Sequence, residues 1–229
     1  MSEEKKSESA KYWQEHLLSW EASAYYEDTQ LKAGWWDGLS TFFRGDAMYV
    51  RMRAALELLS PHLPGQSVLD VGCGSGRFSF QMLEAGAARV IGVDISQQAV
   101  ELAEMQRDAR GLAGRLEFRV ADLVSPVTSL PSVDIVTALG VIEYFDAAAM
   151  AAFLKNLNTR YVIFDFPDLR RKNEFPTWQL RQVYIRVNRL PGVYLYSLEQ
   201  FAQIATPFGL NDLRVVERDG FYYVTNLPA

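Results

Sequence analysis

The sequence predicts an α/β protein built on a doubly wound, mainly parallel sheet, and three observations support this class. A short apolar run at 68–71 leads into a glycine-rich turn at 72–76, as at the first strand of an open α/β sheet. Strand-like apolar runs then alternate with helix-like segments, the pattern of a parallel sheet covered by helices. The chain closes with two strand-like runs joined by Asp219 and Gly220, a pair that favours a hairpin turn.

The composition is that of a globular domain and excludes several functions. The 229 residues are 49% hydrophobic and 22% charged, enough to bury a core. A net charge of −5 disfavours a nucleic-acid partner, which requires clustered Lys and Arg. The single cysteine, Cys73, excludes an internal disulfide and a cysteine-rich metal site. With no apolar run of about 20 residues and no signal-peptide pattern, we expect a cytoplasmic protein without a membrane span or a metal.

Residues 1–60 are expected to form a helical cap ahead of the main domain at 61–229. Four apolar residues at helical spacing predict a helix over 11–26: Trp13, Leu17, Trp20 and Ala24. Asp46 is the expected cap of a second helix, whose apolar face comprises Met52, Ala55, Leu56 and Leu59. Pro61, Pro64 and Gly65 end that helix before the first strand.

The elements of the main domain follow in order from local signals. Helices are predicted over 77–85, from the cap Ser96 to 110, from the cap Asp146 to 157, and from the cap Ser197 to 206, where Gly209 closes the last. Strands are predicted over 68–71, 89–94, 116–120, 133–138, 161–166, 213–217 and 221–225.

Residues 167–196 form an insertion that is longer than the usual connection in an α/β fold. It carries an apolar helical stripe and a set of basic residues, and it leaves the carboxyl end of the fifth strand, where open α/β sheets bind ligands. This position predicts a substrate lid. The alternative is a solvated basic surface.

The spacing of the glycine turn indicates which ligand it binds. Residues 70–76 read D-x-G-x-G-x-G, whereas a dinucleotide fingerprint needs a third glycine where Arg77 or Ser79 stands. The basic group of a phosphate-binding loop is also missing. Two further acids, Asp94 and Asp122, close the next two predicted strands, and Asp94 lies where a carboxylate accepts ribose hydroxyls.

Together with residues 134–144, these motifs resemble the class I S-adenosylmethionine-dependent methyltransferases. The resemblance implies a Rossmann-like, seven-stranded sheet whose last strand is antiparallel, and S-adenosyl-L-methionine as the cofactor, with S-adenosyl-L-homocysteine as product. It implies that Asp70 and the glycine backbone hold the methionine part, that Asp94 binds the ribose, and that Asp122 meets the adenine amino group. The predicted cofactor-binding residues are Asp70, Gly72, Cys73, Gly74, Gly76, Asp94, Ile95, Ala121, Asp122, Leu123, Leu139 and Gly140.

The predicted acceptor is a small molecule methylated on a carboxylate or hydroxyl oxygen. Aromatic pairs at 25–26 and 35–36 and the stretch at 189–194 are similar, in a patchy way, to magnesium-protoporphyrin and ubiquinone-pathway methyltransferases. The predicted substrate residues are Trp36, Arg44, Arg170, Arg171 and Tyr184. Tyr144 stands where many relatives carry a histidine. It can orient a substrate, but a pKa of about 10 makes it a poor base.

Three other classes remain as alternatives. One is a cofactor-binding module of the same fold without catalysis. Another is a nucleic-acid methyltransferase, although residues 139–142 lack the N/D-P-P-Y/F motif of base-amino methylation. The third is a dinucleotide oxidoreductase, which Arg77 disfavours.

Overall fold

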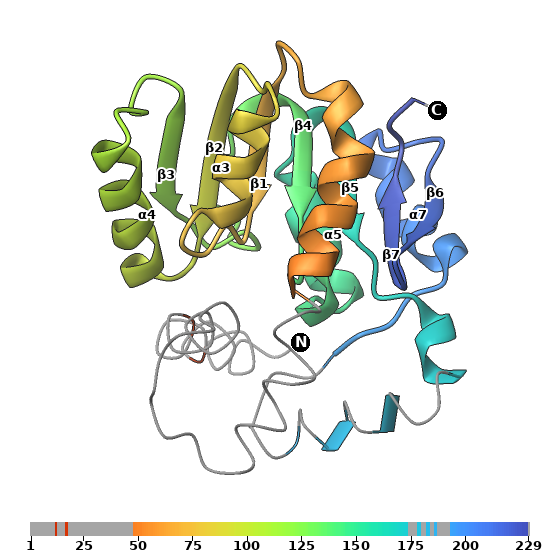
Figure 1. Cartoon of the computed structure of the whole chain (residues 1–229). Helices are drawn as coiled ribbons and strands as arrows, with labels where there is room; N and C mark the ends of the chain where they lie inside the picture. The colour runs from red at the N-terminus through yellow and green to blue at the C-terminus, as the bar shows by residue number, and fades with distance from the viewer. Residues whose placement is uncertain are drawn as a thin grey trace.

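The structure of the chain is a computed structural model (Figure 1). It describes residues 12 and 17, 48–173, 178–179, 182–183, 186 and 193–228. The predicted helix over 11–26 and the cap Asp46 therefore lie outside the described residues, apart from Tyr12 and Leu17, which are helical. Of the apolar stripe predicted in the insertion, Trp178 and Val183 are helical, and Tyr184 and Val187 lie outside the described residues.

Seven strands of the described chain form one sheet in the order β3-β2-β1-β4-β5-β7-β6. They are β1 (Ser67–Val71), β2 (Arg89–Asp94), β3 (Leu116–Val120), β4 (Ser132–Ala138), β5 (Asn158–Asp165), β6 (Arg214–Arg218) and β7 (Phe221–Thr225). The first five are parallel to one another, and β7 is antiparallel to both β5 and β6. The predicted fold class, with an antiparallel last strand, is confirmed.

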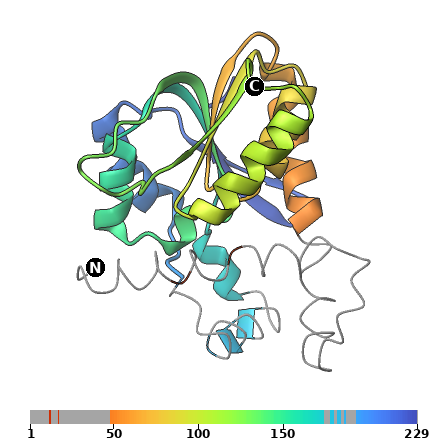
Figure 2. The same cartoon turned by 90° about the vertical axis from the view of Figure 1, so that its left-hand side faces the viewer.

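Helices cover both faces of the sheet (Figure 2). The helix over residues 48–59, α3 (Arg77–Glu84) and α4 (Gln97–Ala109) pack on one face, and α5 (Ala147–Lys155) and α7 (Leu198–Ala205) pack on the other. Short 3-10 turns link them: η1 (Ser60–His62), η2 (Ile142–Tyr144), η3 (Leu169–Asn173) and η4 (Thr206–Phe208). The side chains of Ser96, Asp146 and Ser197 accept hydrogen bonds from the first turns of α4, α5 and α7, which confirms the three predicted caps.

The fifth strand begins three residues earlier than predicted, and α5 ends two residues earlier. Asn158 and Thr159 pair with Ser132 and Val133 of β4, and the Thr159 hydroxyl donates to the Asp134 carbonyl at 3.0 Å. These pairings are tertiary contacts, so the apolar pattern of the segment did not reveal them.

The core lies in two layers, one on each side of the sheet. On the first side, Leu59 and Met52 of the helix over 48–59 are buried with Phe80 and Phe118, and Ala55 is fully buried, as predicted. On the other side, four phenylalanines from α5, β5 and α7 form a chain of contacting rings with centroids 5.6–6.4 Å apart: Phe153, Phe164, Phe166 and Phe201. Both layers hold the strands rigidly, so their carboxyl ends are fixed relative to one another.

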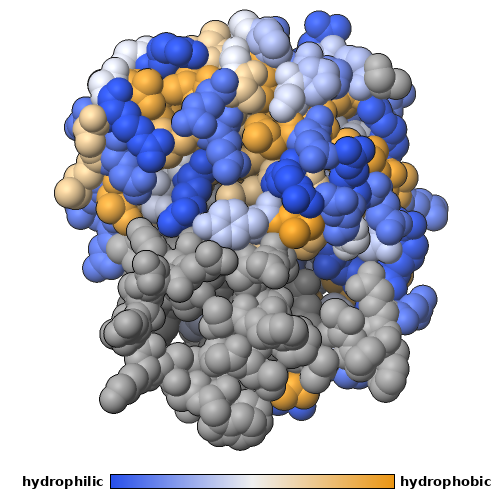
Figure 3. Space-filling view, viewed as in Figure 1, coloured by the Kyte–Doolittle hydropathy of each residue, from blue (hydrophilic) through white to orange (hydrophobic). Residues whose placement is uncertain are grey.

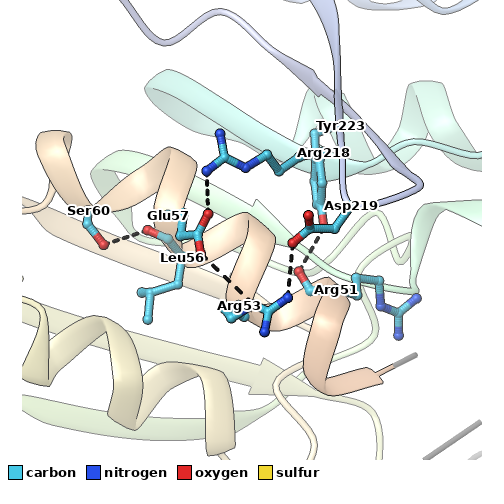
Figure 4. Close-up of polar contacts among 8 residues, drawn as sticks. All are labelled: Arg51, Arg53, Leu56, Glu57, Ser60, Arg218, Asp219 and Tyr223. Carbon is cyan, nitrogen blue, oxygen red and sulfur yellow. Dashed lines mark hydrogen bonds and ion pairs between the residues drawn. The ribbon is translucent and has the colours of Figure 1, made fainter. Parts of the chain in front are cut away.

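The outer face of the helix over 48–59 is polar and contacts the β6–β7 hairpin. The side of the molecule seen in Figure 1 shows many charged and polar side chains in its described part, with apolar residues between them (Figure 3). Arg53 pairs with Glu57 and Asp219, and Glu57 also pairs with Arg218 (Figure 4). The buried Tyr223 hydroxyl donates to the Arg51 carbonyl at 2.7 Å, which anchors the helix to β7. Exposed ion pairs each contribute little, so this buried contact and the apolar face hold the helix.

Within the described ranges, no helix is long and apolar enough to cross a bilayer. The same ranges contain no cluster of histidine, cysteine and acidic side chains suited to a metal ion.

Candidate active site

The glycine turn is a strained backbone segment at the carboxyl end of β1. Gly72, Gly74 and Gly76 all have positive φ angles, between 52° and 85°. A Cβ on Gly72 would lie 2.2 Å from Cγ2 of Val141, so no side chain fits there. The amides of Gly72 and Cys73 both donate to the Val93 carbonyl, at 2.8 and 3.1 Å, and tie the turn to β2. At these three positions the backbone carries no Cβ, so it can lie close to a ligand.

Asp94 supports this turn from the end of β2. One carboxylate oxygen accepts the Gly74 amide and the other accepts the Ser96 amide, both at 2.9 Å. Its side chain is 6% exposed, and burial raises the pKa of the carboxyl. Each carboxylate oxygen has a second lone pair, so Asp94 can brace the turn and still accept a ligand hydroxyl. The predicted neighbour Ile95 is half-buried beside it.

Asp70 lies beneath the turn and faces the protein interior. Its carboxylate accepts the Ser79 hydroxyl of α3 at 2.6 Å and the Thr137 hydroxyl of β4 at 3.1 Å. Burial raises the pKa of Asp70 to about 6, and the two hydroxyl hydrogen bonds only partly oppose that shift. The geometry gives Asp70 the position of a brace that joins β1, α3 and β4. Its direct contact with a cofactor stays a prediction.

The end of β3 contributes the segment 121–123. The Ala121 amide donates to the Asp94 carbonyl at 2.8 Å, which holds the ends of β2 and β3 together. Asp122 is exposed and caps its own turn through the Val124 amide at 3.1 Å, whereas Leu123 is buried. Of the three predicted acids, Asp122 is thus the most exposed to solvent.

The end of β4 lies next to the glycine turn. Leu139 and Gly140 are half-buried, and Gly140 has a φ of 70°. A Cβ on Gly140 would lie 2.9 Å from both terminal nitrogens of Arg51, so a guanidinium sits directly against this backbone. Tyr144 ends η2 and is half-buried, with its amide bonded to the Val141 carbonyl at 3.1 Å.

A pocket lies at the carboxyl end of β5. It is lined by Arg51, Glu143, Asp165, Phe166, Pro167, Arg171, Leu195 and Phe221. Arg51 donates to Asp165 at 2.7 Å, and both side chains are nine-tenths buried. Arg171 lies 3.8 Å from the other Asp165 oxygen, and its guanidinium carbon lies 5.6 Å from the Tyr222 ring. We call these three residues, Arg51, Asp165 and Arg171, the Arg–Asp–Arg cluster.

The two ends of the insertion are held together at the same edge. Asp168 and Tyr196 form a β-bridge, and the Tyr196 hydroxyl donates to the Phe145 carbonyl at 2.6 Å. Arg170 makes two hydrogen bonds to Asp168, at 2.9 and 2.7 Å, and stacks on Tyr222. The insertion therefore starts from a fixed base beside the pocket.

The structure brings all twelve predicted cofactor residues to the carboxyl ends of β1–β4, with Tyr144, Arg170 and Arg171 at the adjoining edge. Trp36, Arg44 and Tyr184 lie outside the described residues. Sequence reasoning missed Ser79, Thr137, Arg51 and Asp165. Two signals could have found the last two: Arg51 lies one turn from Ala55 on the apolar face of its helix, and Asp165 interrupts the apolar run 162–166.

The residues present fit an adenosyl cofactor. Three glycines in left-handed conformation follow β1, a carboxylate ends β2 and an exposed acid follows β3. This is the switch point at which open α/β sheets bind nucleotides.

Comparisons with known proteins agree with this geometry. A sequence model of the methyltransferase domain matches residues 68–160. The magnesium-protoporphyrin O-methyltransferase of Rhodobacter capsulatus is 30% identical over 174 residues, which cover 75% of each chain. A ubiquinone biosynthesis O-methyltransferase of Bordetella avium is 32% identical over 115 residues, covering 50% of this chain and 46% of the relative.

Solved structures share the fold at lower identity. The magnesium protoporphyrin IX methyltransferase of Synechocystis PCC 6803, determined with bound S-adenosylhomocysteine, superposes with a TM-score of 0.64 at 21% identity, over 96% of this chain and 97% of that one. The fold and site define a Rossmann-like methyltransferase. The chain belongs to the class I S-adenosylmethionine-dependent methyltransferases, and its cofactor is S-adenosylmethionine.

Proposed function

We propose that this enzyme methylates an oxygen atom of a small-molecule acceptor bound over the pocket at the end of β5. The observation that carries the proposal is the position of Arg51, whose guanidinium lies against Gly140 of the predicted cofactor site and also pairs with Asp165 of the pocket. One side chain thus spans both regions, so an acceptor over the pocket would lie beside the methionine end of the cofactor. The two relatives named above are both O-methyltransferases, which supports oxygen as the methylated atom.

The chemistry asks little of the protein beyond alignment. S-adenosylmethionine, when bound, would supply an activated sulfonium methyl, so that an acceptor oxygen aligned with the methyl carbon forms the O–C bond while the S–C bond breaks and S-adenosylhomocysteine leaves. The glycine turn and the twelve predicted residues hold the cofactor, with Asp94 at the ribose and Asp122 at the adenine. Tyr144 orients the acceptor, and alignment with exclusion of water supplies the rate. Residues 1–60 act as a cap, and 167–196 as a lid that starts from the base fixed by Asp168 and Tyr196.

The fraction of a cell extract that receives a labelled methyl group tests which class of acceptor the enzyme uses. Purified enzyme would receive S-adenosylmethionine with a deuterated methyl group, together with a fractionated cell extract. We expect label in the dialysable small-molecule fraction. Alkali then separates the two oxygen classes, because it releases methyl from an ester and leaves an ether intact. Label confined to RNA or protein would contradict the proposal.

The cofactor contact of Asp94 is tested by Asp94→Asn. The substitution replaces one of the two accepting oxygens by an NH2 donor, which weakens the ribose contact and the brace on Gly74 or Ser96, so S-adenosylhomocysteine affinity should fall about ten- to hundredfold. Calorimetric titration measures this, with Asp134→Asn as the control. Asp134 accepts two hydrogen bonds from Ser67 at the opposite end of the sheet. If both variants bind S-adenosylhomocysteine with equal affinity, another residue binds the ribose.

A further inference from the structure

We infer that Phe118 of β3 is a positioning residue for the cofactor. Its ring supports the glycine turn at Gly76 from inside the fold, and so sets how tightly the turn binds an adenosyl ligand. Phe118 acts through the turn and not by contact with the cofactor. The inference goes beyond the proposed function, because it concerns the cofactor turn alone and makes no use of an acceptor.

The ring of Phe118 reaches the turn because β2 carries a glycine between them. β3, β2 and β1 are neighbours in the sheet (Figure 1), and Gly92 of β2 pairs with Phe118 on one side and Asp70 on the other. A Cβ on Gly92 would lie 2.5 Å from Cδ1 of Phe118 and 2.9 Å from Sγ of Cys73. The space over Gly92 is therefore filled by the ring from β3 and by the thiol from the turn.

The far end of the same ring lies under Gly76. A Cβ on Gly76 would lie 2.6 Å from Cζ of Phe118 and 2.9 Å from Cε1. Gly76 has a φ of 85° and caps the start of α3: its amide donates to the Cys73 carbonyl and its carbonyl accepts the Phe80 amide, both at 2.9 Å. The ring thus contacts the residue at which the turn becomes helix, so the position of that residue depends on how far the side chain at 118 extends.

Packing holds the ring in place on its other sides. Phe118 and Phe80 are each 4% exposed, and their ring centroids lie 6.0 Å apart with the planes tilted by 57°. The guanidinium carbon of Arg110, which ends α4, lies 4.2 Å from the centroid of Phe80. A ring enclosed in this way cannot swing aside cheaply, because protein interiors are close-packed. Phe118 is therefore a fixed support beneath the turn.

Leucine and methionine at position 118 separate support of the turn from simple filling of the core. The two side chains have similar volumes, and each leaves space where the ring was. Only methionine, with its unbranched stem, extends as far as Cζ of the ring. A residue that merely fills the core would make the two variants alike in cofactor affinity, whereas a support for Gly76 requires reach.

Calorimetric titration of the full-length protein with S-adenosylhomocysteine measures this difference. We expect Phe118→Leu to bind about tenfold more weakly than the parent, which corresponds to the loss of about one hydrogen bond between turn and ligand. Phe118→Met should stay within about threefold of the parent.

Phe201→Leu is the matched control. Phe201 is fully buried against Phe164 and Phe166 on the opposite face of the sheet, so the same atoms are removed from a core that does not contact the turn. This variant should unfold at lower denaturant concentration than the parent, but a protein that is still folded keeps its binding site. Its affinity for S-adenosylhomocysteine should therefore stay within about twofold of the parent.

Amide hydrogen exchange gives a second readout that does not involve binding. In Phe118→Leu without ligand, the amides of Gly76 and Phe80 should exchange at least about fivefold faster than in the parent, because the turn opens locally more often. In Phe201→Leu these two amides should exchange as in the parent. Equal rates in all three proteins would contradict a support of the turn by Phe118.

The outcomes separate the inference from the proposed function. If Phe118→Leu and Phe118→Met weaken binding equally, or if Phe118→Leu binds as well as Phe201→Leu, the inference is wrong while the methyltransferase site stands. If Phe118→Leu does not fold, Gly92→Ala carries the test. Gly92 lacks a positive φ, so alanine suits the strand, but its methyl would displace the ring. An unchanged affinity in Gly92→Ala overturns the inference. Failure of the parent to bind S-adenosylhomocysteine would instead contradict the cofactor site itself.

Discussion

Asp70 shows how one buried carboxylate can brace a binding turn from beneath. It receives hydroxyl protons from Ser79 and Thr137, which belong to different elements, and so fixes the end of β1 against α3 and β4. The cost is desolvation of its charge, which is why the pKa of this carboxyl rises to about 6.

This shift predicts a pH dependence of stability. The folded pKa lies above the unfolded value of 3.8, so the folded state holds the proton more tightly, and stability is lost as the pH rises between the two values. Asp70→Asn removes the titration. The free energy of unfolding of the parent, relative to this variant, should therefore fall by roughly 2 kcal/mol between about pH 4 and about pH 7. Denaturant unfolding at several pH values measures the difference, and a flat or rising difference would contradict the assignment.

At the scale of elements, the glycine turn and the end of β4 fit together sterically. Gly72 has a φ of 70°, and Val141 fills the space where its Cβ would stand. The turn can therefore keep its shape only while both residues stay as they are, or change together.

A pair of variants tests this fit. Gly72→Ala should destabilise the fold by roughly 2–4 kcal/mol, because a left-handed backbone conformation and a clash with a stiff β-branched side chain add together. Val141→Ala in the same chain removes the clashing methyl and should recover part of that loss. The cost of the left-handed backbone conformation at residue 72 remains. Chemical denaturation of the four chains of this double-mutant cycle measures the coupling. If the effects of the two substitutions on the free energy of unfolding are strictly additive, the glycine turn and the end of β4 are not coupled.

The sequence predicted most elements because their signals are local. Helix caps at Ser96, Asp146 and Ser197 and the hairpin at Asp219 and Gly220 depend on neighbouring residues alone, and all are found. The start of β5 was missed because Asn158 and Thr159 become strand only by pairing with β4. The glycine turn and its acids were predicted because they form a sequence motif with fixed spacing. The Arg51–Asp165 ion pair was not predicted, because the two residues are 114 positions apart and no spacing rule connects them.

At the scale of the whole molecule, the predicted cofactor residues and the pocket lie side by side where the parallel strands end. The cofactor residues follow the ends of β1–β4, and the pocket follows β5 and the start of β7. The helix over 48–59 connects them, because it is anchored to β7 by Tyr223 and places Arg51 between Gly140 and Asp165. In the proposed reaction, donor and acceptor would thereby be held by one rigid body, which in-line transfer requires.

A crystal structure with S-adenosylhomocysteine bound tests this arrangement most directly. We predict the adenosyl group across the ends of β1–β3, its ribose at Asp94, and its sulfur facing the Arg–Asp–Arg cluster at the end of β5. A sulfur that faces away from that pocket, or a ligand bound at another edge of the sheet, would contradict the account.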